Sequence, residues 1–318
     1  MGTLAALWGA SYLFIKIALD DGMRAPSIVF ARIALGALVL VPLALRAGAF
    51  SGLAGRWRWV LAVALCQVAV PFLLITYGER WIPSALAGIL VASTPIFVAL
   101  LTPFMDRSDA ISRAGAVGVV VGIVGVVLLF GVDLSGDAKL ALGGAMVLLA
   151  GFGYAIASIW VRTSLGGAQP VGIAAGTMVL AALVTLPLAV AQPPEHDIAL
   201  GTVAALVALG AGGTGIAFLI YYRLIHDVGT NRATVVAYLA PGFAVVYGAA
   251  FLDERITAAT IGGLALILAG SWIAAEARLP WQSRVAGAPG AAAELAQEPL
   301  AEDQAARVPV GPSTSSRS

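Results

Sequence analysis

Ten apolar runs of about 20 residues occupy most of this sequence, and only short connections separate them. A helix of about 20 residues spans the hydrocarbon core of a bilayer, because each residue advances the helix by about 1.5 Å. Unpaired backbone groups are costly in lipid, so such runs cross a membrane as helices. The sequence therefore predicts an all-α, multi-pass integral membrane protein. Its ten transmembrane helices are expected at 3–20, 26–45, 59–78, 84–105, 113–132, 140–160, 170–191, 198–222, 231–252 and 256–275.

Composition excludes several classes of partner. Of the 318 residues, 60% are hydrophobic, 11% are charged and the net charge is +1, so we expect no nucleic-acid partner. One cysteine, Cys66, excludes an internal disulfide framework and a cysteine-rich metal site. Residues 276–318 are rich in Ala, Pro, Gly, Ser and Glu, which predicts a disordered tail.

The positions of Lys and Arg between the runs predict the orientation. Positive charge gathers in cytoplasmic connections. A cytoplasmic amino terminus places ten of these residues on the cytoplasmic side and four on the other, and an even number of helices puts both termini inside. The ten are Arg46, Arg56, Arg58, Arg107, Arg113, Arg162, Arg223, Arg232, Arg278 and Arg284, and the four are Arg24, Arg80, Lys139 and Arg255. The tail is then cytoplasmic.

The two halves of the sequence resemble each other. Pro95 pairs with Pro241 at an offset of 146 residues (241 − 95), and Asp109 pairs with Glu254 at an offset of 145 (254 − 109). A duplication of five helices predicts two repeats, residues 1–132 and 138–275. Because five is odd, the second repeat enters the membrane inverted, which is typical of secondary transporters.

Pro95 and Pro241 lie near the centres of their runs. A proline removes one N–H and leaves a carbonyl one turn earlier without its helical donor, here on Val91 and Ala237. A symmetric pair favours two kinks that line a central cavity and act as hinges. The alternative is a kink that neighbouring groups such as Ser93 and Thr94 re-satisfy. The segment "DER", Asp253 to Arg255, is interpreted as the water interface.

Two segments and one single residue resemble the EamA-type branch of the drug/metabolite transporter superfamily. They are "LWGASYLFIKIAL" (Leu7–Leu19), Arg32, and "LAPGFAVVYGAAFLDERITAATIGGLALILAGSWI" (Leu239–Ile273), and the likeness covers residues 3–275. The resemblance implies a ten-helix inverted-repeat carrier that moves small metabolites, often outward, by alternating access. Asp109 stands where the second repeat has Glu254, which departs from that pattern.

Two cationic residues, Lys16 and Arg32, lie in apolar runs away from the first two residues of a run, and a charge there normally marks a partner or a pathway. Lys16 can pair with Asp20 four residues later, or extend its ammonium to the membrane surface. Arg32 can anchor a helix interface by bonding helix carbonyls, or bind a substrate carboxylate.

Several aromatic and polar side chains join these two as candidates for a central cavity, with plain packing as the alternative. The full candidate set is Trp8, Tyr12, Lys16, Arg32, Tyr77, Ser93, Tyr154, Tyr222 and Tyr238. Glycine spacings such as Gly118 to Gly122 are interpreted as close helix packing.

The acidic residues fall at the ends of runs, in connections or in the tail, and His196 and His226 lie in separate connections. The sequence thus predicts no paired-carboxylate site, no metal and no cofactor, and therefore no enzyme. No carboxyl group lies at the middle of a run, where proton coupling would need one. Glu79, at the outer end of the third run, is the nearest candidate and is interpreted as a solvated cap, so transport is expected to be independent of a proton gradient.

The expected function is transport of a small molecule, amino-acid-like by its chemistry, by efflux or exchange across the cytoplasmic membrane. An exporter of lipophilic cationic drugs, a channel and a membrane sensor stay open as alternatives. The lipid bilayer is the expected surrounding, and the protein is expected to be a monomer or a weak homodimer.

Overall fold

The computed structural model describes residues 1–105, 112–133, 137–194, 196–228 and 235–276. Every regular element among these residues is helical, as the sequence predicts. The first half contains α1 (Gly2–Asp20), α2 (Ala25–Arg46), η1 (Ser51–Leu53), α3 (Trp57–Val63), η2 (Ala64–Ala69), α4 (Val70–Gly78), α5 (Ser84–Val91), α6 (Thr94–Met105) and α7 (Arg113–Val132). The second half contains α8 (Ala138–Ser164), α9 (Pro170–Ala191), α10 (Leu200–Val207), η3 (Ala208–Ile216), α11 (Ala217–Val228), α13 (Val235–Phe251) and α14 (Ala258–Glu276).

Nine helical runs in the described part of the chain are long and apolar enough to cross a membrane. They lie close to the predicted spans, because run length and hydropathy determine both. The tenth, α13, has 17 described residues, and the residues just before it lie outside the described part. The chain is an integral, multi-pass membrane protein. The inverted topology and the side on which the termini lie stay predictions, and the predicted tail from residue 277 onward lies outside the described residues.

Two runs contain a π-helical segment that the sequence did not predict. The segment η2 joins α3 to α4, and η3 joins α10 to α11, so each run continues through the segment. Their starts are 144 residues apart (208 − 64), close to the offset between the two halves. A π-helical turn often marks a functional position, because it leaves backbone groups differently paired from those of an α-helix.

The two prolines have different consequences. At Pro95 the helix is broken, because α5 ends at Val91 and α6 begins at Thr94. The Thr94 hydroxyl donates to the Val91 carbonyl at 2.7 Å, and the Ser271 hydroxyl of α14 donates to the Ala92 carbonyl at 2.9 Å. Side chains thus satisfy the freed carbonyls, as the alternative interpretation expected.

Pro241 is buried inside α13, which continues through it from Val235 to Phe251. The sequence treated Pro95 and Pro241 as equivalent kinks, but among the described residues only the first interrupts its helix. A proline lacks one donor in either case, and whether the helix ends there depends on its neighbours.

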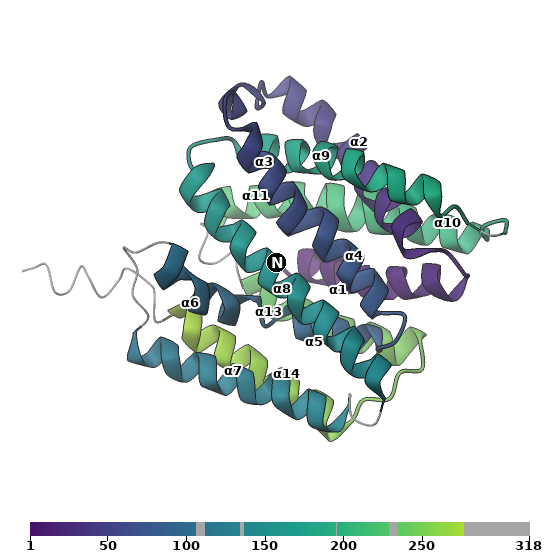
Figure 1. Ribbon diagram of the computed structural model, residues 1–318, viewed down its shortest axis with the longest axis vertical. Helices are drawn as coiled ribbons and strands as arrows, with labels where there is room; N and C mark the ends of the chain where they lie inside the picture. Colours follow the sequence, from purple (N-terminus) through teal and green to yellow (C-terminus); the bar gives the residue numbers. More distant parts are fainter. Residues whose placement is uncertain (106–111, 134–136, 195, 229–234, 277–318) are drawn as a thin grey trace, which may run out of the picture. The chain divides into compact units, whose positions relative to one another are not determined.

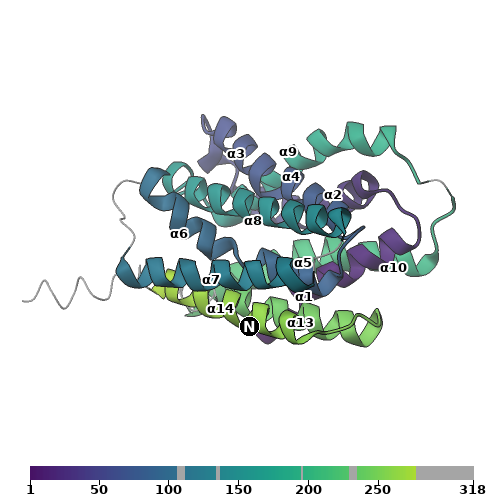
Figure 2. The same ribbon diagram turned by 60° about the horizontal axis from the view of Figure 1, so that its bottom comes forward.

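Helices of the two halves lie side by side (Figures 1 and 2). The helix α7 packs along α14, α2 packs along α9, and α1 packs along α13. The long helix α8 contacts α4, α5 and α6. These contacts bring the carboxyl end of α4 and the amino end of α5 close to α1 and to the connection that follows α13.

The contact between α7 and α14 depends on glycine. A Cβ added to Gly118 would lie 2.5 Å from the Ala274 backbone nitrogen and 2.7 Å from the Gly270 carbonyl oxygen. The two backbones can approach this closely only without side chains. At one end of the pair, the Asp133 carboxylate accepts hydrogen bonds from the hydroxyls of Thr257 and Thr260 at 2.6 and 2.8 Å.

We predict that Gly118→Ala lowers the free energy of unfolding by about 1–3 kcal/mol, because the new methyl group displaces backbone atoms that cannot move independently. Thermal unfolding of the purified protein in detergent measures the effect. Gly131→Ala on the same helix is the matched control, since a Cβ there meets no atom within 4 Å. Equal losses from both substitutions would contradict this account of the contact.

Candidate functional site

Arg32 of α2 is fixed by two groups inside the membrane-spanning region. Its Nε donates a hydrogen bond to the Thr214 hydroxyl in η3 at 3.1 Å. Its guanidinium carbon lies 3.8 Å from the centroid of the Phe72 ring in α4, a cation–π distance. Among the described residues, neither Nη group donates a hydrogen bond. Arg32 is therefore held in place while most of its donors stay unused.

Two tyrosines accompany Arg32. Tyr12 of α1 and Tyr154 of α8 interact electrostatically with each other and with Arg32. Both rings pack against the largest buried apolar cluster, which includes Ile15 and Leu90. The structure thus brings three of the predicted cavity residues together, two from the consecutive helices α1 and α2 and one from α8 in the second half of the chain.

Three other predicted cavity residues, Trp8, Tyr238 and Ser93, make different contacts. The Trp8 ring packs against Tyr221 with centroids 5.3 Å apart. The Tyr238 hydroxyl donates to the Ser271 carbonyl at 3.3 Å, and its ring packs against Trp272. Ser93 donates to the Leu90 carbonyl at 2.6 Å. Tyr77 is half-buried in α4, and the side chain of Tyr222 lies outside the described part of the structure.

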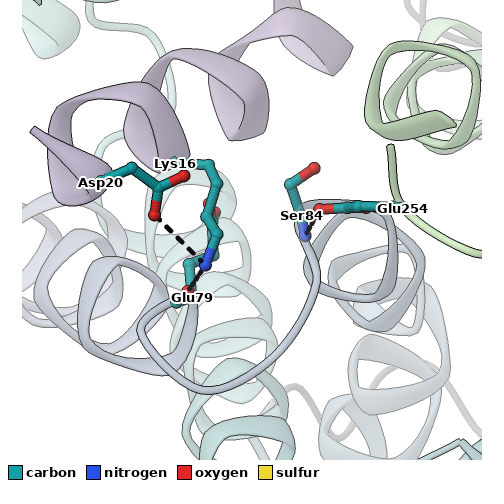
Figure 3. Close-up of polar contacts among 5 residues, drawn as sticks. All are labelled: Lys16, Asp20, Glu79, Ser84 and Glu254. Carbon is teal, nitrogen blue, oxygen red and sulfur yellow. Dashed lines mark hydrogen bonds and ion pairs between the residues drawn. The ribbon is translucent and has the colours of Figure 1, made fainter. Parts of the chain in front are cut away.

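Lys16 connects α1 to the end of α4 (Figure 3). Its Nζ lies 3.7 Å from Asp20 Oδ1, the pair expected from the sequence, and it also donates to the Glu79 carbonyl at 3.1 Å. The carboxylate of Asp20 is 57% exposed. One ammonium group therefore links an exposed acid to the main chain of the turn that joins α4 to α5.

Glu254 joins the two halves of the chain at the amino end of α5. Its two carboxylate oxygens accept hydrogen bonds from the backbone nitrogens of Ser84 and Ala85 at 2.6 and 2.9 Å (Figure 3). These are orphan N–H groups of a helix amino terminus, where a carboxylate is stabilised by the hydrogen bonds and by the helix dipole. A Cβ on Gly248 would collide with the Glu254 carboxylate, so glycine makes room for this contact.

The position of Glu254 corrects the interpretation of "DER" as a simple water interface. Asp253 and Arg255 are exposed, but Glu254 turns inward to the start of α5. The sequence paired Glu254 with Asp109 at the equivalent position of the first repeat. That pairing was the signal that could have distinguished Glu254 from its two neighbours. Asp109 lies outside the described residues.

Glu79 is buried, which contradicts its interpretation as a solvated cap. The residue is 0% exposed, and neither carboxyl oxygen has a hydrogen-bond partner among the described residues. Burial raises the pKa of the Glu79 carboxyl well above its ordinary value, and the positive charge of Lys16 offsets only part of this effect. Glu79 follows directly after the span that ends at Gly78.

No group of three His, Cys, Asp or Glu residues in the described part of the chain lies close enough to hold a metal ion. The polar groups that do converge, around Arg32 and around Glu79, can bind an anion and a proton respectively. Sequence reasoning found Arg32 and Lys16 but missed Thr214, Phe72 and the burial of Glu79.

Comparisons with known proteins agree on one family. The model of the EamA-like transporter family matches residues 1–131 and again 141–275. The uncharacterized inner membrane transporter YedA of Escherichia coli K12 is 30% identical over 264 residues, which cover 80% of this chain and 82% of YedA. A probable amino-acid metabolite efflux pump of the same organism is 24% identical, with 86% of this chain and 93% of the pump covered.

A solved crystal structure shares the fold. It superimposes with a TM-score of 0.60 at 20% identity and covers 86% of this chain and 98% of its own. At this identity the likeness concerns the fold alone.

We predict that Glu254→Ala lowers the free energy of unfolding by about 1–2 kcal/mol, because two N–H groups at the start of α5 lose their acceptor. Glu254→Gln keeps one acceptor oxygen and is expected to lose less. Thermal unfolding in detergent measures both. Asp253→Asn is the matched control, since Asp253 is exposed and Asn tolerates its φ of 52°. A Glu254→Ala protein as stable as the wild type would contradict the contact.

We also predict a pH dependence of stability that Glu79 controls. Below its ordinary pKa of about 4.3, Glu79 is protonated in both the folded and the unfolded chain, and its contribution to stability is fully present. As the pH rises, the unfolded chain ionises first, so the free energy of unfolding falls by up to about 1.4 kcal/mol per pH unit until the folded-state pKa is passed.

Glu79→Gln cannot ionise and removes this contribution. Thermal unfolding between pH 4 and pH 9 should therefore show a smaller decline for Glu79→Gln than for the wild type. Parallel profiles for the two proteins would contradict the buried, protonated state of Glu79.

Proposed function

The chain belongs to the EamA-like transporter family, and we propose that it carries a small amino-acid-like metabolite across the cytoplasmic membrane by alternating access. The observation that carries the substrate class is Arg32, a cation within a membrane span. Its Nε is anchored, and its Nη groups donate no hydrogen bond to any residue that the structure describes. A guanidinium fork binds a carboxylate through two parallel hydrogen bonds. The substrate is thus an anion or a zwitterion with a carboxylate.

The surroundings of Arg32 support this assignment. Thr214 and Phe72 fix the guanidinium from two other helices, so that it meets a ligand with little loss of side-chain entropy. Tyr12 and Tyr154 add two hydroxyl groups near the same point. A fixed cation disfavours a cationic drug, which would place two positive charges together in a region of low dielectric constant.

The two halves support a mechanism of rocking repeats. Each half carries a π-helical segment in its third span, and contacts between the halves occur in reciprocal pairs. For example, the first span contacts the ninth through α1 and α13, and the sixth contacts the fourth through α8 and α6. We propose that the repeats rock about the Arg32 site, with bending near Pro95 and Pro241.

Relatives support the direction and the location. One relative is named a probable amino-acid metabolite efflux pump, and YedA is named an inner membrane transporter. We propose efflux or exchange in the cytoplasmic membrane, with both termini in the cytoplasm, as the distribution of Lys and Arg indicates.

A binding screen tests the proposal. Purified protein is unfolded thermally in the presence of individual L-amino acids, and each one that raises the midpoint is tested again as its amide and as its decarboxylated amine. Binding to the folded state raises the midpoint by mass action. We expect stabilisation by the amino acid and none by the two derivatives that lack the carboxylate.

Arg32 variants complete this test. Arg32→Gln should weaken binding of the amino acid by about 10- to 100-fold, as expected for the loss of hydrogen bonds to a charged group. Arg113→Gln, a change of an exposed arginine, should leave binding unchanged. Unaltered binding by a folded Arg32→Gln protein would contradict the role of Arg32, and stabilisation by lipophilic cations alone would favour a drug exporter.

A further inference from the structure

Glu79 is a buried acid for which the arrangement described above offers no structural use. It lies in the turn between α4 and α5, and both its carboxyl oxygens lack hydrogen-bond partners among the described residues (Figure 3). The Ser84 hydroxyl, five residues later, is also buried without a partner there. Both residues lie where the two halves of the chain meet.

An unpartnered carboxylate is very costly to bury, whereas a neutral carboxylic acid costs much less. A leucine or a glutamine at this position would avoid the cost of ionisation altogether. Glu79 therefore adds no stability that an uncharged residue could not supply. A group of this kind at a functional site is typically one that changes its protonation state.

The charged and titratable groups around Glu79 act in opposite directions. Lys16 of α1 and Arg32 of α2 favour its ionisation, whereas Asp20 of α1 and Glu254, which follows α13, oppose it. Tyr12 of α1 also interacts with it electrostatically. Lys16, the strongest favourable charge, is already engaged by Asp20 and by the Glu79 carbonyl. In this conformation the acid form is favoured.

The turn that contains Glu79 lies next to an exposed residue and to a contact between the two halves. Arg80, the next residue, is exposed. Glu254 bonds the backbone of Ser84 and Ala85 and so joins the second half of the chain to the start of α5. If the two halves separate at this end, those two hydrogen bonds break and water enters beside the turn that contains Glu79.

We propose that Glu79 binds a proton while this end of the protein is closed and releases it to water when the end opens, so that transport is coupled to proton movement. The inference rests on the alternating-access function proposed above. In the step, the O–H bond of the Glu79 carboxyl breaks, the proton passes to water, and the carboxylate pairs with the Lys16 ammonium, which already bonds the main chain of the same residue. This reverses the expectation from the sequence that transport is independent of a proton gradient.

Infrared difference spectroscopy tests the proton site without any substrate. Wild-type protein in lipid nanodiscs should show the carbonyl stretch of a protonated carboxyl group at neutral pH, and Glu79→Gln should lack it. Glu79→Leu, which fills the space with no polar group, is a second variant with the same expected result. A wild-type spectrum without a band that these variants remove would overturn the proposal.

Transport into proteoliposomes tests the coupling, with a radiolabelled mixture of L-amino acids as the probe. We expect the wild type to show counterflow at equal pH and accumulation when a pH gradient is imposed. Glu79→Gln should retain counterflow and lose the accumulation driven by the gradient. Asp197→Asn, which changes an exposed acid, should behave as the wild type does.

The outcomes separate the two proposals. Counterflow by the wild type with no response to the gradient, or gradient-driven accumulation by Glu79→Gln, would overturn proton coupling and leave the carrier function standing. Absence of counterflow in the wild type would contradict the carrier function. The infrared comparison of the wild type with the Glu79 variants decides the proton site in either case.

Discussion

The structure depends on one constraint, that every backbone N–H and C=O within the bilayer needs a partner from the protein itself. Continuous helices meet this requirement with their own backbone hydrogen bonds. The span that is interrupted between α5 and α6 does not. At the break before Pro95, the Val91 carbonyl is bonded by Thr94 and the Ala92 carbonyl by Ser271 of α14. At the start of the same run, Glu254 supplies the acceptors. The interrupted span is thus completed partly by the second half of the chain, so its geometry is linked to the packing of the two halves.

The sequence predicts the spans well because hydropathy and run length are local properties. The predicted span 113–132 coincides with α7, and 84–105 coincides with the two ends of the α5 and α6 run. Local patterns could not distinguish Pro95 from Pro241, because whether a proline ends a helix depends on hydroxyl groups and neighbours contributed by other helices. The π-helical segments were missed because a local pattern does not distinguish a π-helical turn from an α-helical turn within an apolar run.

The candidate site was predictable where charge and spacing coincide within one helix. Lys16 and Asp20 are four residues apart and do form a pair, and Arg32 stands out because it lies inside an apolar run. Glu79 gives no such signal, and the only signal for Glu254 is its pairing with Asp109 between the repeats. An acid at the end of a run has the same local sequence whether it next meets water or the end of another helix, and only the three-dimensional arrangement decides between them.

Glu79 and Glu254 show how one end of the protein can give two glutamates different roles. The amino terminus of α5 offers its N–H groups to Glu254, whose carboxylate oxygens accept hydrogen bonds from two of them. Glu79 receives none, and the nearby negative charge of Glu254 further disfavours its ionisation. The first residue can therefore join the two halves, and the second can titrate. Because the same carboxylate contributes to both effects, breaking the contact of Glu254 with α5 changes the surroundings of Glu79 as well. Separation of the halves and release of a proton are then consequences of one structural event.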